Sequence, residues 1–304
     1  MAEVDRGGDA GREQGSAPSR RRQRLRRAVL AASVLHDVDV ATEPHGVVLD
    51  GHRPVTLSWD DVARAHGDTP GDLAHLRLGR WLRLHRLVAE LGPAVQDLRP
   101  AARLLALPVG HVEHPGEGWT LHRPMGGALE CGLAMTGVLG DPDEVVALPP
   151  SVVREAGIPL RVWWPGVVDH ASTMGHLAVE RLRRDTQRPV RVPDEVVDTQ
   201  LVLRPVGGID VPTLLATHVV RRYLASSDGS GMRAAAVPMR SRGWYDLSRI
   251  DPAFVAAAWS ATDDLDKGLA RPLLVTADAV ALAPVAPPGS PARIPLPEQV
   301  RRFV

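Results

Sequence analysis

The segment 111–122, HVEHPGEGWTLH, holds the densest group of potential metal ligands in the chain, with three histidines and two glutamates in twelve residues. Imidazole and carboxylate groups are ligands that proteins use for zinc and iron(II). A helix is excluded here because Pro115 and Gly116 interrupt the segment and Pro108 precedes it. The segment is therefore expected to form a β-hairpin that turns at residues 116–117.

In this hairpin, the alternation of side chains places His111 opposite His122, with Glu113 diagonal to the pair on the same face. Two opposed imidazoles and a diagonal carboxylate form a candidate site for zinc or iron(II), the basis of a metal-dependent enzyme. The same alternation also describes an ordinary hairpin whose polar face is solvated and holds no metal. We expect the solvated face and therefore no cofactor.

A β-hairpin and two consecutive helices are expected ahead of this segment. Asp50-Gly51, flanked by short apolar runs, is a strong signal for a two-residue turn. Ser58 is expected to cap a helix over 59–66, and a second helix is expected over 70–91.

These two helices resemble the helix-turn-helix motif of DNA-binding proteins in the spacing of small and apolar residues. The matching positions are Val62, Ala63, Gly67, Leu73 and Leu76. The resemblance implies that arginines of the second helix contact phosphates, and these are Arg77, Arg80, Arg83 and Arg86. Asp68 departs from the motif, which prefers an apolar residue at that position. The second helix is also apolar around most of its circumference, which favours burial among other helices or in a homo-oligomer.

The composition excludes several classes of enzyme. Lys267 is the only lysine, and it stands in Asp266-Lys267-Gly268, so the chain has neither a P-loop nor the lysine of a protein kinase. Cys131 is the only cysteine, which excludes an intramolecular disulfide and a multi-cysteine zinc site. A formal net charge of zero provides no global attraction to nucleic acid or to anionic membranes.

Serine-hydrolase signatures are also missing from the sequence. The G-x-S-x-G motif does not occur in the chain. Asp169, Ser172 and His176 share a stripe of one expected helix, where an acid rarely orients a base against a nucleophile. We expect these residues to form a polar rim on a packed helix.

One folded region is expected between two unfolded ends. Residues 1–27 are expected to form a disordered leader that includes six arginines in eight positions, and residues 283–304 a proline-rich tail. The region 28–282 is expected to be α+β with mainly antiparallel strands, not a Rossmann or P-loop fold. A division into two subdomains near residue 160 is left open. The expected strands are 104–112, 119–121, 232–239 and 273–276, and the later helices are 151–156, 166–184, 211–224 and 252–259.

The sequence also predicts a cellular location and a general class of function. No apolar run approaches the roughly 20 residues that span a bilayer, and no signal-peptide cleavage site follows the arginines, so a cytoplasmic protein is expected. The absence of asparagine and the single lysine are typical of GC-rich codons, and indicate a high-GC bacterium. We expect a non-catalytic binding, regulatory or self-associating protein, with the helix over 70–91 as its partner surface. The alternatives are a DNA-binding protein and a metal-dependent enzyme.

Overall fold

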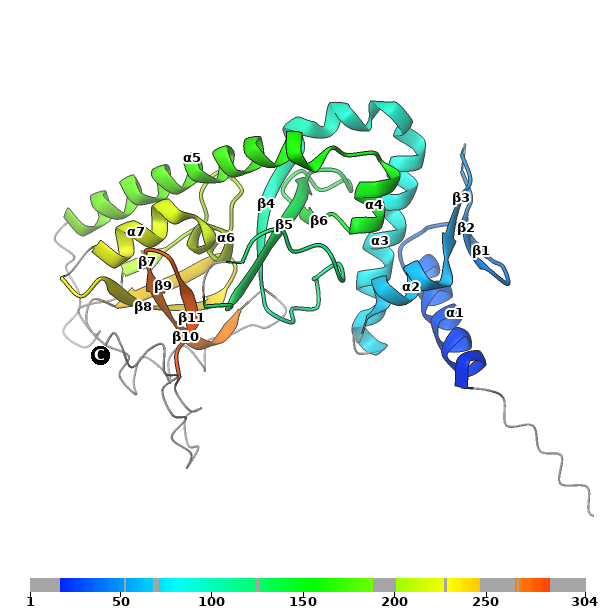
Figure 1. The fold of residues 1–304 in the computed structure, drawn as a ribbon, viewed down its shortest axis with the longest axis horizontal. Coiled ribbons are helices and arrows are strands. Elements are labelled where there is room, and N and C mark those ends of the chain that lie inside the picture. Colours follow the sequence, from blue (N-terminus) through cyan, green and yellow to red (C-terminus); the bar gives the residue numbers. More distant parts are fainter. Residues whose placement is uncertain are drawn as a thin grey trace, which may run out of the picture.

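The computed structural model describes residues 17–51, 53–67, 71–123, 126–187, 201–226, 229–246, 266 and 268–284. These residues form helices and three antiparallel sheets, which confirms the predicted α+β class (Figure 1). The helix expected over 252–259 and most of the proline-rich tail lie outside the described residues.

The first six elements form an N-terminal unit at one end of the molecule (Figure 1). They are α1 Ala17–Leu35, β1 Val40–Thr42, β2 Gly46–Leu49, β3 Val55–Ser58, α2 Trp59–His66 and α3 Gly71–Leu91. The strands form a sheet in the order β1-β2-β3. This unit has a hydrophobic core of its own, in which Val29 of α1, Val47 of β2 and Val62 of α2 are buried together.

Local sequence signals place the hairpin and the start of α2 correctly. Strands β2 and β3 pair in antiparallel register around the turn that follows Leu49. Ser58 caps α2, because its hydroxyl oxygen accepts a hydrogen bond from the backbone N–H of Asp61 at 3.1 Å. Gly67 ends the helix with φ of +54°, a conformation that favours glycine.

Helix α1 includes the arginine run that we expected in a disordered leader. It begins at Ala17, eleven residues before the folded region was expected to start. Leu25, Val29 and Ala32 form a stripe on one face of the helix and are buried in the N-terminal core. Because this stripe begins at Leu25, within the arginine run, the packing of α1 against α3 stabilises the helical conformation of the run as well.

Helix α3 joins the N-terminal unit to the rest of the molecule. Trp81 and Leu82 are buried in the N-terminal core, whereas Leu84 and Val88 are buried in the main core. The helix is apolar around most of its circumference because it packs on two sides within one chain. Most of the surface that we expected to bind a partner is therefore used internally, although Leu76 remains exposed.

Two further antiparallel sheets and the remaining helices form the body of the protein. The middle sheet has the order β4-β5-β6, and the C-terminal sheet has the order β11-β10-β8-β9-β7. The elements are the 3-10 helix η1 Gly92–Ala101, β4 Ala102–Pro108, β5 Leu129–Thr136, β6 Val145–Ala147, α4 Pro150–Glu155, α5 Leu160–Gln187, β7 Leu201–Leu203, α6 Val211–Ala216, α7 His218–Ser226, β8 Met232–Met239, β9 Arg242–Asp246, β10 Leu269–Thr276 and β11 Val280–Leu282. The long helix α5 runs along the body (Figure 1) and packs on α6 and α7, with the main core between helices and sheets.

The hairpin predicted over 111–122 does not form, and that prediction is wrong. Strand β4 ends at Pro108 and pairs along its whole length with β5. The 111–122 segment leaves the sheet through turns, and His122 returns to it in an isolated bridge with Cys131. A long ladder with a strand that is buried at all but its last residue is more stable than a short hairpin that contains Pro115.

Two predicted helices have different bounds in the structure. The helix expected over 211–224 is divided at Thr217, which has an extended backbone between α6 and α7. The helix expected over 166–184 is longer, because α5 begins at Leu160 and continues through Pro165. None of the described helices combines the length and the apolar character needed to cross a membrane.

Candidate functional site

The three predicted metal ligands have separate surroundings. The Nδ1 atom of His111 accepts a hydrogen bond from the backbone N–H of Glu113 at 3.1 Å. The Glu113 carboxylate accepts one from Arg80 at 2.7 Å, and His122 is exposed beside β5. In the described part of the chain, no group of three His, Cys, Asp or Glu side chains is arranged to hold a metal ion. The predicted set depended on a hairpin register that the chain does not adopt.

The arginines predicted to contact phosphates lie against groups of the protein itself. Arg80 contacts Glu113 and also Glu144, whose Oε1 is 3.5 Å from the Arg80 Nε. Arg77 lines a small cavity that Arg80 and Glu113 also line. Arg83 donates a hydrogen bond to the Leu139 carbonyl oxygen, and Arg86 donates one to the Glu90 carboxylate. DNA binding by these four arginines stays a prediction. DNA phosphates would have to compete with the internal partners for the guanidinium groups.

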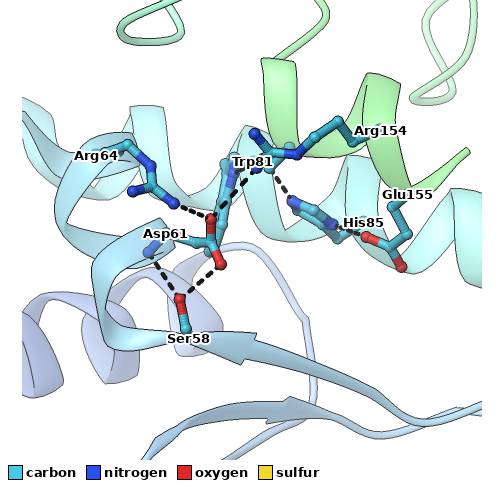
Figure 2. A network of polar contacts seen from close by, with 8 residues as sticks. Ser58, Asp61, Arg64, Trp81, His85, Arg154 and Glu155 are labelled. Atoms are coloured by element: carbon cyan, nitrogen blue, oxygen red, sulfur yellow. Dashed lines mark hydrogen bonds and ion pairs between the residues drawn. The ribbon is translucent and has the colours of Figure 1, made fainter.

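A polar network lies where α3 meets α4 (Figure 2). Trp81 Nε1 donates a hydrogen bond to Ser151 Oγ at 3.0 Å, and His85 Nε2 lies 3.0 Å from the same oxygen. His85 Nδ1 contacts Oε2 of Glu155. Ser151, His85 and Glu155 therefore have the connectivity of a serine nucleophile, its base and the acid that orients the base.

The spacing of four residues on both helices brings these side chains together. Trp81 and His85 face one side of α3, and Ser151 and Glu155 face one side of α4. Pro150 occupies the first position of α4, where its missing N–H leaves no helical hydrogen bond unmade. Ser151 follows at the second position, with its hydroxyl against α3.

The partners determine where the protons of the network lie. A carboxylate only accepts hydrogen bonds, so His85 carries its ring proton on Nδ1, toward Glu155. In the neutral imidazole the Nε2 atom is unprotonated and accepts the hydroxyl hydrogen of Ser151, whose oxygen accepts the N–H of Trp81. This tautomer is the one that a general base requires, because Nε2 is able to take the proton of Ser151 Oγ.

The base is shielded from solvent while the hydroxyl borders a cavity. The His85 side chain is 1% exposed, and Trp81 packs edge-on against it with the ring centroids 4.7 Å apart. Ser151 is half-buried and lines a polar cavity of about 230 Å³ between α2, α4 and residues 115–117. A molecule in this cavity would therefore meet the serine with the imidazole behind it. The charged residues that line the cavity are Asp61, Arg64, Glu117 and Arg154.

Asp61 holds two of these arginines at the cavity (Figure 2). Its Oδ1 atom contacts Arg64, and lies 3.7 Å from Nη2 of Arg154, while Ser58 donates to Oδ2 at 2.7 Å. Burial raises the pKa of Asp61, but hydrogen bonds from Ser58 and Arg64 outweigh this effect and leave the pKa below its usual value. The carboxylate is therefore ionised at neutral pH and pairs with both guanidinium groups.

A second cavity, of about 160 Å³, adjoins the first and is mainly apolar. Pro150 and Arg154 line both cavities. The apolar side chains that line the second cavity are Trp119, Leu121, Leu133, Leu148, Val153 and Leu160.

Residues 115–121 form the outer wall of both cavities. Trp119 anchors this wall, because its Nε1 donates to the Leu133 carbonyl oxygen at 2.9 Å. The ring of His114 packs edge-on against Trp119 with the centroids 5.0 Å apart. Burial lowers the pKa of His114, although the nearby Glu130 carboxylate partly opposes this effect. The contact with His114 therefore adds to the packing that holds Trp119 in this wall.

The serine, histidine and glutamate were not predicted as a site because they are distant in the chain. His85 and Ser151 are 66 residues apart, and the packing of α3 against α4 brings them together. The serine begins a short helix rather than a G-x-S-x-G turn, so motif recognition cannot find it. The available signal was a histidine on the buried, apolar side of a helix, where it requires polar partners.

The chain matches no protein-family model, no curated protein and no solved structure in the comparisons made. Its function therefore has to be inferred from the geometry of the site.

Proposed function

We propose that this protein hydrolyses small ester substrates, with Ser151 as nucleophile, His85 as general base and Glu155 as the group that orients the base. The observation that carries the proposal is the bridging position of His85, whose two ring nitrogens contact the Ser151 hydroxyl and the Glu155 carboxylate. This connectivity recurs in hydrolases with unrelated folds. The activity is proposed for the cytoplasm, the compartment expected from the sequence.

The reaction would proceed through an acyl-enzyme. Ser151 Oγ attacks the carbonyl carbon of the ester while His85 Nε2 takes the hydroxyl proton. The bond between the carbonyl carbon and the leaving oxygen then breaks, and His85 returns the proton to the leaving alcohol. A water molecule attacks the acyl-serine, gives one proton to His85, and releases the carboxylic acid as Ser151 regains its proton.

Charged and polar groups of the site support this chemistry. Negative charge develops on the carbonyl oxygen in the transition state, and positive groups fixed nearby stabilise it. Arg154 lines the cavity one helical turn after Ser151, and Arg64 lines it from α2. The Trp81 N–H that donates to Ser151 Oγ favours negative charge on this oxygen as its proton leaves.

Covalent labelling by a fluorophosphonate probe tests the proposal, because such probes react with activated serines. We expect wild-type protein to gain one probe mass, located at Ser151 by peptide mapping. Ser151→Ala and His85→Gln should not be labelled, and Glu155→Gln should react at least about tenfold more slowly. Ser172→Ala, a half-buried serine on α5, is the matched control and should react like the wild type.

Two results would refute this proposal: no labelling of folded wild-type protein, or labelling that persists in Ser151→Ala. In either case the network would serve to hold α4 against α3, and the non-catalytic binding role expected from the sequence would be the better account.

The exposed apolar end of α1 supports self-association as a second candidate function. Leu30, Val34 and Leu35 are 40%, 82% and 63% exposed, and such residues gathered at one helix end are typical of contact surfaces. We expect sedimentation velocity to show a dimer that dissociates in Val34→Glu. The control is Val168→Glu on α5, an exposed valine outside this patch. A monomeric wild type would exclude this function.

A further inference from the structure

The two cavities beside Ser151 have different chemistry. Charged side chains from α2, α4 and the outer wall line the larger one. The smaller one is lined by aliphatic and aromatic side chains, and its charged lining residue, Arg154, also borders the larger cavity. Pro150 stands at the boundary of the two cavities, since it lines both, and a Cβ atom built at Gly118 in the smaller one would lie 3.6 Å from the Pro150 ring.

The proposed nucleophile stands next to this boundary. Ser151 directly follows Pro150, which lines both cavities, and Val153 extends from the same helix into the apolar one. An ester whose carbonyl carbon lies at Ser151 Oγ has two arms, the acyl chain and the alcohol. The arrangement provides a separate environment for each arm: an apolar one for a hydrocarbon chain and a charged one for a polar alcohol.

We propose that the apolar cavity binds the acyl chain, so that the preferred substrates are esters of short, unbranched fatty acids. This inference rests on the proposed function and specifies its substrate class. At about 160 Å³ the cavity is smaller than the pockets of roughly 300–1,000 Å³ that hold drug-sized ligands, so it has room for a short hydrocarbon chain only. An acyl chain of about four to six carbons is therefore expected to fit best, with the alcohol in the cavity lined by Arg64 and Glu117.

The chain-length profile of ester hydrolysis tests this assignment. With p-nitrophenyl acetate, butyrate, hexanoate and decanoate, kcat/KM should rise about fourfold per methylene up to the optimum and then fall. Leu121→Trp places a larger side chain in the apolar cavity, at a residue that is 40% exposed and therefore tolerant of substitution. In this variant the ratio of kcat/KM for hexanoate to kcat/KM for acetate should fall at least about tenfold.

Leu177→Trp is the matched control, because Leu177 is 44% exposed on α5 and does not line the cavity. It should keep the wild-type profile. If all esters are hydrolysed with a flat profile, or if Leu121→Trp and Leu177→Trp behave alike, the acyl assignment is wrong while the proposed function stands.

Binding to Ser151→Ala gives a readout that does not depend on catalysis. Ligand-observed NMR with acetate, butyrate and hexanoate should show binding that strengthens with chain length and is lost when Leu121→Trp is added. If these acids bind in this way but no ester is hydrolysed and no probe reacts, the cavity assignment holds and the catalytic proposal fails. If hexanoate binds no better than acetate, the apolar cavity does not hold an acyl chain.

Discussion

Replacing Ser151 with alanine should destabilise the folded protein in addition to removing the proposed nucleophile. The Ser151 hydroxyl oxygen is the shared partner of Trp81 Nε1 and His85 Nε2. The two partners are 3% and 1% exposed, so neither nitrogen can turn toward bulk solvent when the hydroxyl is lost. The substitution therefore leaves two buried polar groups without this partner.

The expected loss of stability is limited by the neighbouring cavity. A buried polar group that loses its partner costs about 1–3 kcal/mol, so two groups set an upper bound of about 6 kcal/mol. However, Ser151 borders a cavity of about 230 Å³, which has room for water. A water molecule at the former hydroxyl position would restore most of both hydrogen bonds. We therefore expect the free energy of unfolding to fall by about 1–2 kcal/mol.

Urea unfolding followed by tryptophan fluorescence measures this change through the midpoint and the slope of the transition. The control, Ser172→Ala, should change the free energy of unfolding by less than about 0.5 kcal/mol. In a double-mutant cycle, Ser151→Ala and His85→Gln should show a coupling of about 0.5 kcal/mol or more, because they remove one shared contact. Additive effects, or an unfolding free energy equal to that of the wild type, would show that the network is not formed as described.

Three further predictions concern other parts of the molecule. Burial raises the pKa of the Cys131 thiol to about 12, so the protonated thiol should not react with iodoacetamide at pH 7.5 in native protein, but should react in urea; labelling at equal rates in both states would contradict this. Burial, and secondarily a neighbouring histidine, lowers the pKa of His36 below 6.5. The unfolded chain therefore binds this proton first, and the free energy of unfolding should fall as the pH drops below about 6.5. His36→Gln should show a shallower fall in urea titrations at pH 7.5 and 5.5, and an unchanged slope would count against the assignment. Gly132→Ala should destabilise by about 1–3 kcal/mol, because its Cβ would lie 2.3 Å from the Trp119 ring. Gly166→Ala, where a Cβ would meet nothing within 4 Å, should be neutral or stabilising, and equal thermal shifts for the two variants would refute the packing argument.

Features that depend on neighbouring residues were predictable from the sequence. The hairpin of β2 and β3, the Ser58 cap and the end of α2 at Gly67 each follow from a turn or cap within a few residues. The apolar circumference of α3 correctly indicated a helix buried on several sides. The folded region was expected to start at residue 28, whereas α1 begins at Ala17, because the arginines conceal a buried stripe that begins at Leu25.

The pairing of β4 was decided by a competition that local pattern does not reveal. The alternation over 111–122 favours a hairpin, but a hairpin forms only if its first strand has no better partner. Strand β5 lies further along the chain and pairs with β4 over its whole length. The 111–122 segment leaves the sheet and rejoins it only at His122, and its residues 115–121 form the outer wall of the two cavities.

The sequence by itself determined the α+β class, the lack of a P-loop motif, and the helices that carry His85 and Ser151. It did not determine that these two residues touch, because no short-range rule connects residues 66 positions apart. Their contact depends on α3, which packs against α1 and α2 on one side and against α4 on another. A buried histidine must satisfy both ring nitrogens, and only the tertiary arrangement decides that a serine and a glutamate do so.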